Sequence, residues 1–133
     1  MPLRNPVVLD TDVASFLWRG KLEPEHHRKL VGCTAMLTFV TIAEFWQGAY
    51  KANWDQQQIT RMTDFYGKFD LVRCDFDVVK TWGKLSGLAM QARTPVPAND
   101  CWVAACCVSH DYPLLTRNDK HFKVAEQYGL RLL

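Results

Sequence analysis

The chain lacks both a long apolar run and a strong excess of either charge. Its 133 residues carry a formal net charge of only +2, which by itself is too small to indicate nucleic-acid binding. No stretch approaches the roughly 20 apolar residues of a membrane-spanning helix. The first residues, MPLRNPVVLD, hold only a short apolar run that ends in an acid, unlike a signal peptide. We therefore expect a cytoplasmic protein that does not contact a membrane.

The cysteines lack the spacing of a zinc site or of a disulfide framework. Their number, five, is odd, and no two of them form a Cys-x-x-Cys pair. The four histidines do not supply the missing ligands. Cys101 and Cys106 fall inside an apolar helical pattern, which favours buried free thiols in a reducing compartment.

Short apolar segments alternate along the chain with helical patterns. The expected strands are 7–9, 35–39, 70–74, 114–116 and 130–133, and the expected helices are 11–18, 21–29, 41–52, 55–69, 75–93, 99–108 and 119–125. The length fits one domain, 1–133, with its own core. Alternation of this kind predicts a three-layer α/β/α domain around a mainly parallel sheet. In such sheets ligands bind beyond the carboxyl ends of the strands.

Four acidic residues stand at the edges of these apolar segments: Asp10, Glu44, Asp100 and Asp119. Carboxylates that are gathered at one end of a sheet raise one another's pKa unless a divalent cation joins them. Hard oxygen ligands without a competing thiolate select Mg2+ or Mn2+. The pattern therefore predicts metal-assisted chemistry on a phosphodiester.

Each acid also has a purely structural interpretation. Asp10 could cap the helix that follows it, although Asp12 fills that position more comfortably. Asp12 is either this cap or an acid behind the ligands. Glu44 could close a capping box with Thr41, and Asp100 could simply stabilise the first turn of its helix. Asp119 could simply form a turn through its side chain.

Basic residues cluster at Arg19 and Lys21, over 26–29, and around Arg117 and Lys120. A basic rim around an acidic centre could hold a phosphate backbone, so Arg117 and Lys120 are candidates for substrate binding. The alternative is ordinary solvated surface charge.

Several short motifs follow one another along the chain. They are Asp10-Thr11-Asp12-Val13, the stretch 38–45 with Gly48, Asn99-Asp100 followed by Ala104-Ala105, Leu115-Thr116-Arg117-Asn118 with His121-Phe122, and 129–132. Together they resemble the PIN domain, and in particular the VapC-like toxins of bacterial toxin–antitoxin pairs. The resemblance implies a Mg2+-dependent endoribonuclease whose metal-binding acids are Asp10, Glu44 and Asp100.

The last acidic position of the family motif falls on one of two residues, depending on whether it is aligned from Thr116 or from Phe122. Counting from Thr116 selects Asn118, whereas counting back from Phe122 selects Asp119. We favour Asp119, with Asn118 as a polar partner. Thr11 and Thr116 would position a phosphate or a carboxylate, or be merely structural. The resemblance also implies an RNA substrate, a small VapB-like antitoxin whose tail covers the acidic groove, and a homodimer.

Two rival functions remain open at this point. Asp10-Thr11-Asp12 is similar to the phosphatase motif of haloacid dehalogenases, but Ala14 stands where that family has Thr or Val. A PIN-like module could also bind RNA or protein without cleaving it. Gathered acids argue against such a module because they would only destabilise the fold without a metal.

Overall fold

Four short parallel strands form the centre of the protein. The computed structural model describes residues 3–133, with strands β1 (Pro6–Leu9), β2 (Thr34–Thr38), β3 (Asp70–Val72) and β4 (Leu114–Leu115). They lie in the order β3-β2-β1-β4, and every neighbouring pair is parallel. The chain leaves β1 toward β2 on one side and later adds β4 on the other. The carboxyl ends of β1 and β4 therefore flank the switch point where such sheets bind ligands.

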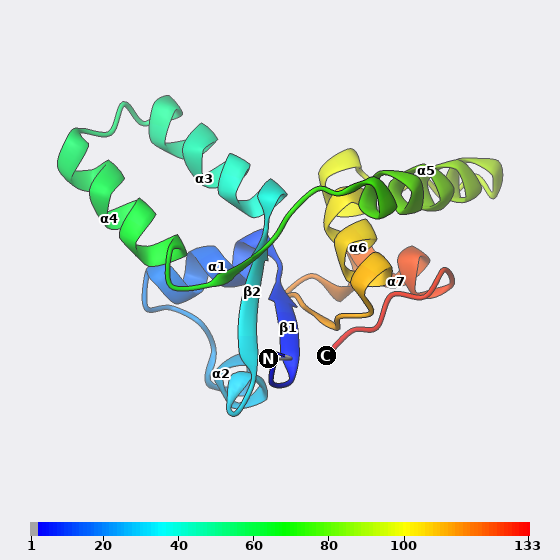
Figure 1. The fold of residues 1–133 in the computed structure, drawn as a ribbon, viewed down its shortest axis with the longest axis horizontal. Coiled ribbons are helices and arrows are strands. Elements are labelled where there is room, and N and C mark those ends of the chain that lie inside the picture. Colours follow the sequence, from blue (N-terminus) through cyan, green and yellow to red (C-terminus); the bar gives the residue numbers. More distant parts are fainter. Residues whose placement is uncertain (1–2) are drawn as a thin grey trace.

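The helices cover both faces of this sheet. They are α1 (Thr11–Trp18), α2 (Pro24–Leu30), α3 (Phe39–Lys51), α4 (Gln56–Tyr66), α5 (Phe76–Gln91), α6 (Ala98–His110) and α7 (Asp119–Glu126). In Figure 1, α1, α3 and α4 lie on one side of the strands and α5, α6 and α7 on the other. This arrangement confirms the predicted three-layer α/β/α architecture.

The side-chain alternation of β1 explains why both faces are covered. Successive residues of a strand point to opposite faces. Val7 and Leu9 accordingly pack into the cluster formed with α1 and α3, whereas Val8 packs into the cluster formed with α5, α6 and α7. Helix α6 is buried along most of its length. Its cysteines Cys101 and Cys106 are buried free thiols, as predicted.

The predicted strand at 130–133 is wrong. Within the described residues this segment makes one isolated bridge, between Leu132 and Leu114. Leu114 N donates to Arg131 O, and Leu133 N donates to Leu114 O. Because β4 is only two residues long, it offers the final segment too few backbone groups for a longer ladder.

Three helices differ from the sequence prediction, in their first residue or their cap, in a way that affects the acids. Helix α3 begins at Phe39, and its cap is Thr38, whose Oγ1 accepts a hydrogen bond from Thr41 N at 3.4 Å. The capping box expected between Thr41 and Glu44 is therefore not formed. Helix α1 is capped by Asp10 itself and not by Thr11 or Asp12. Helix α6 begins at Ala98, directly after Pro97, so Asp100 lies inside its first turn.

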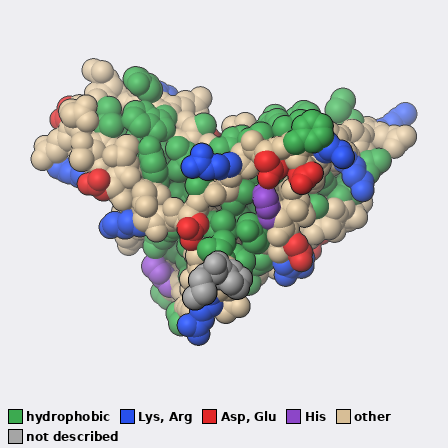
Figure 2. Space-filling view, in the orientation of Figure 1, with side chains coloured by type: hydrophobic (Ala, Val, Ile, Leu, Met, Phe, Trp, Pro, Cys, Tyr) green, Lys and Arg blue, Asp and Glu red, His purple; other side chains and the backbone are tan. Residues whose placement is uncertain are grey.

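The surface shows where the two helical layers diverge. Figure 2 shows a notch in the outline between the α3–α4 pair and α5, and hydrophobic side chains gather over α5 on this face. On that helix Phe76 is 75% exposed and Met90 is 66% exposed. Among residues 3–133, no helix combines the length and apolar character needed to cross a bilayer.

Helix α7 depends on Phe122 for its place against α6. The Phe122 side chain is fully buried, so we expect Phe122→Ala to lower the free energy of unfolding by about 3–5 kcal/mol. Urea denaturation followed by circular dichroism measures this change. The exposed neighbour Lys123, replaced by Ala, should change it by less than about 0.5 kcal/mol. Equal effects of the two substitutions would contradict this account of the packing.

Candidate active site

The carboxyl ends of β1 and β4 bring Asp10 and Thr116 together from positions 106 residues apart. Asp10 N donates to Leu115 O at 2.9 Å, which fixes the backbone where the strands end. Thr116 Oγ1 donates to Asp10 Oδ2 at 3.0 Å, and Thr11 N donates to Asp10 Oδ1 at 2.9 Å. Both carboxylate oxygens of Asp10 are thus held in place, and the residue is only 8% exposed.

Glu44 is positioned by a chain of hydroxyl groups that links α1 to α3. Thr11 Oγ1 donates to Glu44 Oε1 at 2.7 Å and lies 2.9 Å from Thr41 Oγ1. A hydroxyl has a single hydrogen and an ionised carboxylate can only accept. Thr41 must therefore donate to Thr11, which donates to Glu44. The structure thus gives Thr11 the carboxylate-positioning part of its two predicted roles.

Asp100 meets the start of α7 across the site. Its Oδ2 lies 3.4 Å from His121 Nδ1, and Asn118 Nδ2 lies 3.2 Å from the same ring nitrogen. Asn118 N also donates to Thr116 Oγ1 at 3.0 Å. His121 is a site residue that the sequence pattern did not indicate. Its spacing of three from Asn118, at a helix start, was the available signal.

One pocket of about 400 Å³ gathers most of the predicted residues. Its lining is Asp10, Thr11, Asp12, Ser15, Phe16, Arg19, Glu44, Asp100, Asn118 and His121. Ser15 and Phe16 were not predicted as site residues, although with Asp12 and Arg19 they share the i, i+3, i+4, i+7 spacing of one face of α1.

Asp119 lies outside this pocket. It is exposed at the first position of α7 and lines a neighbouring pocket of about 550 Å³, which also contains Thr116, Arg117 and Lys120. Asn118 lines both pockets. Of the two residues considered for the last acidic position, the structure therefore brings Asn118 to the three acids.

Burial and neighbouring acids raise the pKa of Asp10 and of Asp100. Burial raises the pKa of Asp10 from 3.8 to about 7, the charges of Asp12 and Asp100 add to this, and hydrogen bonds from Thr11 and Thr116 oppose it. Burial also raises the pKa of Asp100, and Asp12 adds to the effect, while His121 acts in the opposite direction.

The donors of the pocket fit a hard divalent cation. Besides His121 and hydroxyl groups, they include the carboxylates of Asp10, Asp12, Glu44 and Asp100, and no cysteine lines the pocket. Within residues 3–133, no three histidine, cysteine or acidic side chains are already arranged as a metal site. A bound cation would offset the negative charge of the acids and so remove the part of the raised pKa of Asp10 and Asp100 that comes from their acidic neighbours.

Comparison with protein-family models matches residues 7–127 to the PIN domain. The chain belongs to the PIN domain family. The match includes Asp10 and Asp12, which sets aside the haloacid-dehalogenase interpretation of these two residues. It also includes Glu44, Asp100 and Asn118, so the whole acidic pocket lies within the PIN domain.

Curated relatives and solved structures agree with this assignment. Over 114 residues the chain is 25% identical to Ribonuclease VapC4 of Mycobacterium tuberculosis, covering 84% of this chain and 85% of the relative. It is 24% identical over 130 residues to Ribonuclease VapC1 of Methanocaldococcus jannaschii, covering 86% and 93%. The fold resembles the DNA-bound VapBC structure from Salmonella typhimurium, with a TM-score of 0.83, 22% identity and 96% of both chains covered.

The raised pKa of Asp10 predicts how stability changes with pH when no divalent cation is present. Between 3.8 and about 7 the folded protein holds a proton that the unfolded chain has lost. The free energy of unfolding should therefore fall as the pH rises through this window. A shift of this size corresponds to at most about 4 kcal/mol.

Urea unfolding in the presence of a chelator, at about pH 5 and about pH 8, measures the fall. The opposite contribution of Glu23, whose pKa is lowered from 4.5 to about 2, is already complete above about pH 5. Asp10→Asn should make the fall smaller. A fall of equal size in Asp10→Asn and wild type would contradict the assignment to Asp10.

Proposed function

We propose that this PIN domain is a Mg2+-dependent endoribonuclease that hydrolyses RNA phosphodiester bonds, and that it is the toxin of a type II toxin–antitoxin pair. The observation that carries the proposal is the pocket in which Asp10, Glu44 and Asp100 meet beyond the carboxyl ends of β1 and β4. The ribonuclease names of the curated relatives support the same activity.

Asp10, Asp100 and Glu44 are the residues that would hold the cation, with Mn2+ as a possible substitute for Mg2+. When bound, the cation would act as a Lewis acid and offset the negative charge that develops at the phosphate. Thr116 and the Thr11 amide fix the two oxygens of Asp10. Thr11 also fixes Glu44 through its hydroxyl. His121 orients Asp100 and Asn118 from α7.

Asp12 takes a supporting part. Its Oδ1 accepts from Val13 N at 2.7 Å, and its charge contributes to the raised pKa of both Asp10 and Asp100. The negative charge of Asp12 therefore makes cation binding more favourable, although Asp12 need not contact the cation.

A small VapB-like antitoxin is the proposed protein partner. Two further hollows, of about 550 and 480 Å³, run beside the acidic pocket between α1, α3 and α4, and both include Trp18 and Trp54. Tyr50 on α3 is 76% exposed. Aromatic surface next to an acidic groove suits a peptide that carries apolar and basic side chains. Assembly as a homodimer stays a prediction, for which size-exclusion chromatography with light scattering is the measurement.

Replacing a metal-binding acid tests the proposed activity. We expect Asp10→Asn and Asp100→Asn each to lower Mg2+-dependent cleavage of total RNA by at least about 100-fold, because even outer partners of metal ligands contribute roughly 10–100-fold. Primer extension locates and quantifies the cleaved ends. Asp64→Asn, on the exposed surface of α4, is the matched control.

Calorimetric titration with Mg2+ separates this enzyme from a PIN-like module that only binds RNA or protein. If the acids form a metal site, the wild type should bind Mg2+ more tightly than either variant. A module without catalytic function should bind Mg2+ no better than a surface carboxylate pair, and neither substitution should change its affinity. Full cleavage activity in Asp10→Asn or Asp100→Asn would overturn the proposed function.

The last acidic position has its own test. Because Asn118 lies in the acidic pocket and Asp119 in the neighbouring one, we expect Asn118→Ala to lower cleavage by roughly 10–100-fold. Asp119→Ala should have a much smaller effect. Initial cleavage rates at one mapped RNA site measure both variants. The reverse order of effects would return Asp119 to that position.

A further inference from the structure

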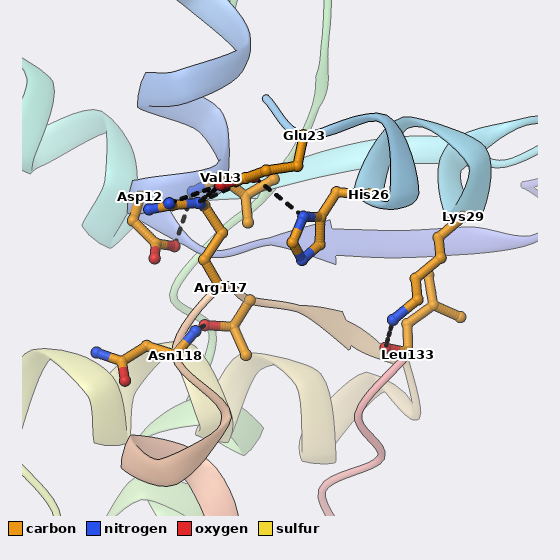
Figure 3. A network of polar contacts seen from close by, with 9 residues as sticks. Asp12, Val13, Glu23, His26, Lys29, Arg117, Asn118 and Leu133 are labelled. Atoms are coloured by element: carbon orange, nitrogen blue, oxygen red, sulfur yellow. Dashed lines mark hydrogen bonds and ion pairs between the residues drawn. The ribbon is translucent and has the colours of Figure 1, made fainter. Parts of the chain in front are cut away.

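Arg117 is held by an acid that lies outside the acidic pocket. The Arg117 Nε donates to Glu23 Oε1 at 2.9 Å and to Oε2 at 3.1 Å, and its Nη2 donates to Oε1 at 2.7 Å. Glu23 is the residue immediately before α2, 94 residues away in sequence. Its other contact is His26, whose Nδ1 lies 3.1 Å from Oε2. Figure 3 shows the Arg117 side chain reaching up between Glu23 and Asp12.

The face of the same guanidinium rests on an aromatic ring. Arg117 Cζ lies 3.6 Å from the centroid of the Phe16 ring, and Arg19 Cζ lies 4.6 Å from it. Phe16 and Arg19 both line the acidic pocket. An ion pair at one edge and an aromatic ring against the face leave the guanidinium few alternative orientations.

One edge of the guanidinium stays available. Glu23 takes Nε and Nη2, and none of the hydrogen bonds formed among residues 3–133 uses Nη1. Arg117 follows Thr116 and precedes Asn118, which are both hydrogen-bonded parts of the site. A cation with a free donor therefore lines the neighbouring pocket, which shares Asn118 with the acidic one.

The pair stays charged across the working pH range. Hydrogen bonding from Arg117 lowers the pKa of Glu23 to about 2. The two side chains are 28% and 35% exposed, so a pair in this position adds little to folding stability. The ion pair with Glu23 therefore contributes little to folding but leaves Nη1 of Arg117 free. Such an arrangement is suited to holding a ligand.

We propose that Glu23 and Phe16 are positioning residues that orient Arg117 so that its free Nη1 edge binds a phosphate of the RNA next to the scissile one. This inference rests on the proposed ribonuclease function. Arg117 was a candidate for substrate binding from sequence alone, whereas Glu23 has the wrong charge for that role and acts only through Arg117. Preorganisation reduces the side-chain ordering that must accompany RNA binding.

Replacing Glu23 tests the inference, because a positioning role and a simple charge effect predict opposite changes in RNA binding. Removing a carboxylate near bound RNA reduces repulsion and should strengthen binding if Glu23 has no positioning role. If Glu23 positions Arg117, Glu23→Gln should instead raise the KM for RNA by about 5–10-fold with little change in kcat. Glu25→Gln is the matched control, because it removes one negative charge from exposed surface two residues away.

A double-mutant cycle identifies the route of the effect. The substrate is a short labelled RNA that spans a site cleaved by the wild type. Arg117→Ala should raise KM about as much as Glu23→Gln, and adding Glu23→Gln to Arg117→Ala should raise it no further. Phe16→Leu is the second positioning variant and should also raise KM only while Arg117 is present. Circular dichroism confirms that each variant is folded.

The salt dependence of RNA binding distinguishes a positioning role of Glu23 from a merely structural one, because a structural role would leave it unchanged. It is measured from the fluorescence anisotropy of the labelled RNA in the Asp100→Asn background, in which we expect cleavage to be at least about 100-fold slower. Loss of one phosphate contact should reduce the slope of log affinity against log salt by about 0.7 for single-stranded RNA. Glu23→Gln and Arg117→Ala should both show this reduction, and Glu25→Gln should not.

The outcomes separate the two proposals. A wild type that cleaves no RNA would overturn the proposed function and this inference with it. A wild type that cleaves, together with a Glu23→Gln variant that binds RNA as well or better, would overturn the inference alone. The inference would also be overturned if Glu23→Gln raised the KM for RNA further in the Arg117→Ala background. It would be overturned as well if Glu23→Gln changed only the inhibition by a protein partner and left RNA binding unchanged.

Discussion

The parallel pairing of β1 with β4 is the constraint on which the rest of the site depends. It places Leu115 O against Asp10 N and the Thr116 hydroxyl against the Asp10 carboxylate. Every other group of the pocket is arranged around that fixed acid. The Thr11 amide holds its second oxygen, and the segment leaving Thr116 delivers Asn118 and His121 to the side where Asp100 lies.

The same pairing makes the site costly for the fold. A carboxylate that is 8% exposed next to two other acids is disfavoured in its charged form. The protein offsets part of that cost with hydroxyl and amide donors instead of a basic side chain on Asp10. This choice leaves the negative charge available to a cation, whereas a lysine or arginine in contact with Asp10 would have neutralised it. The basic groups Arg19 and Arg117 stay at the rim, stacked on Phe16.

Local sequence patterns were reliable where local physics decides. The apolar patterns located strands β1 to β4 and helices α1 to α7 to within about three residues at each end. Helix α2 begins at Pro24 and not at residue 21, because the fixed backbone angle of proline favours the first helical position. The errors arose where a tertiary contact competed with a local one. Glu44 had a plausible local partner in the Thr41 amide, but Thr38 caps α3 and Glu44 accepts from Thr11 of another helix. The final strand had the right apolar pattern but too short a neighbour to pair with.

The sequence by itself determined the layered α/β/α class and selected the acids Asp10, Glu44 and Asp100, because local apolar patterns mark the strands and helices and the family motifs include these acids. Only the tertiary structure decided which residue joins them, by placing Asn118 in the pocket and Asp119 beside it. It alone revealed the contacts of His121 with Asp100 and of Glu23 with Arg117. These contacts join side chains from separate elements, up to 94 residues apart, and the spacing of residues along one helix or strand carries no information about such distances.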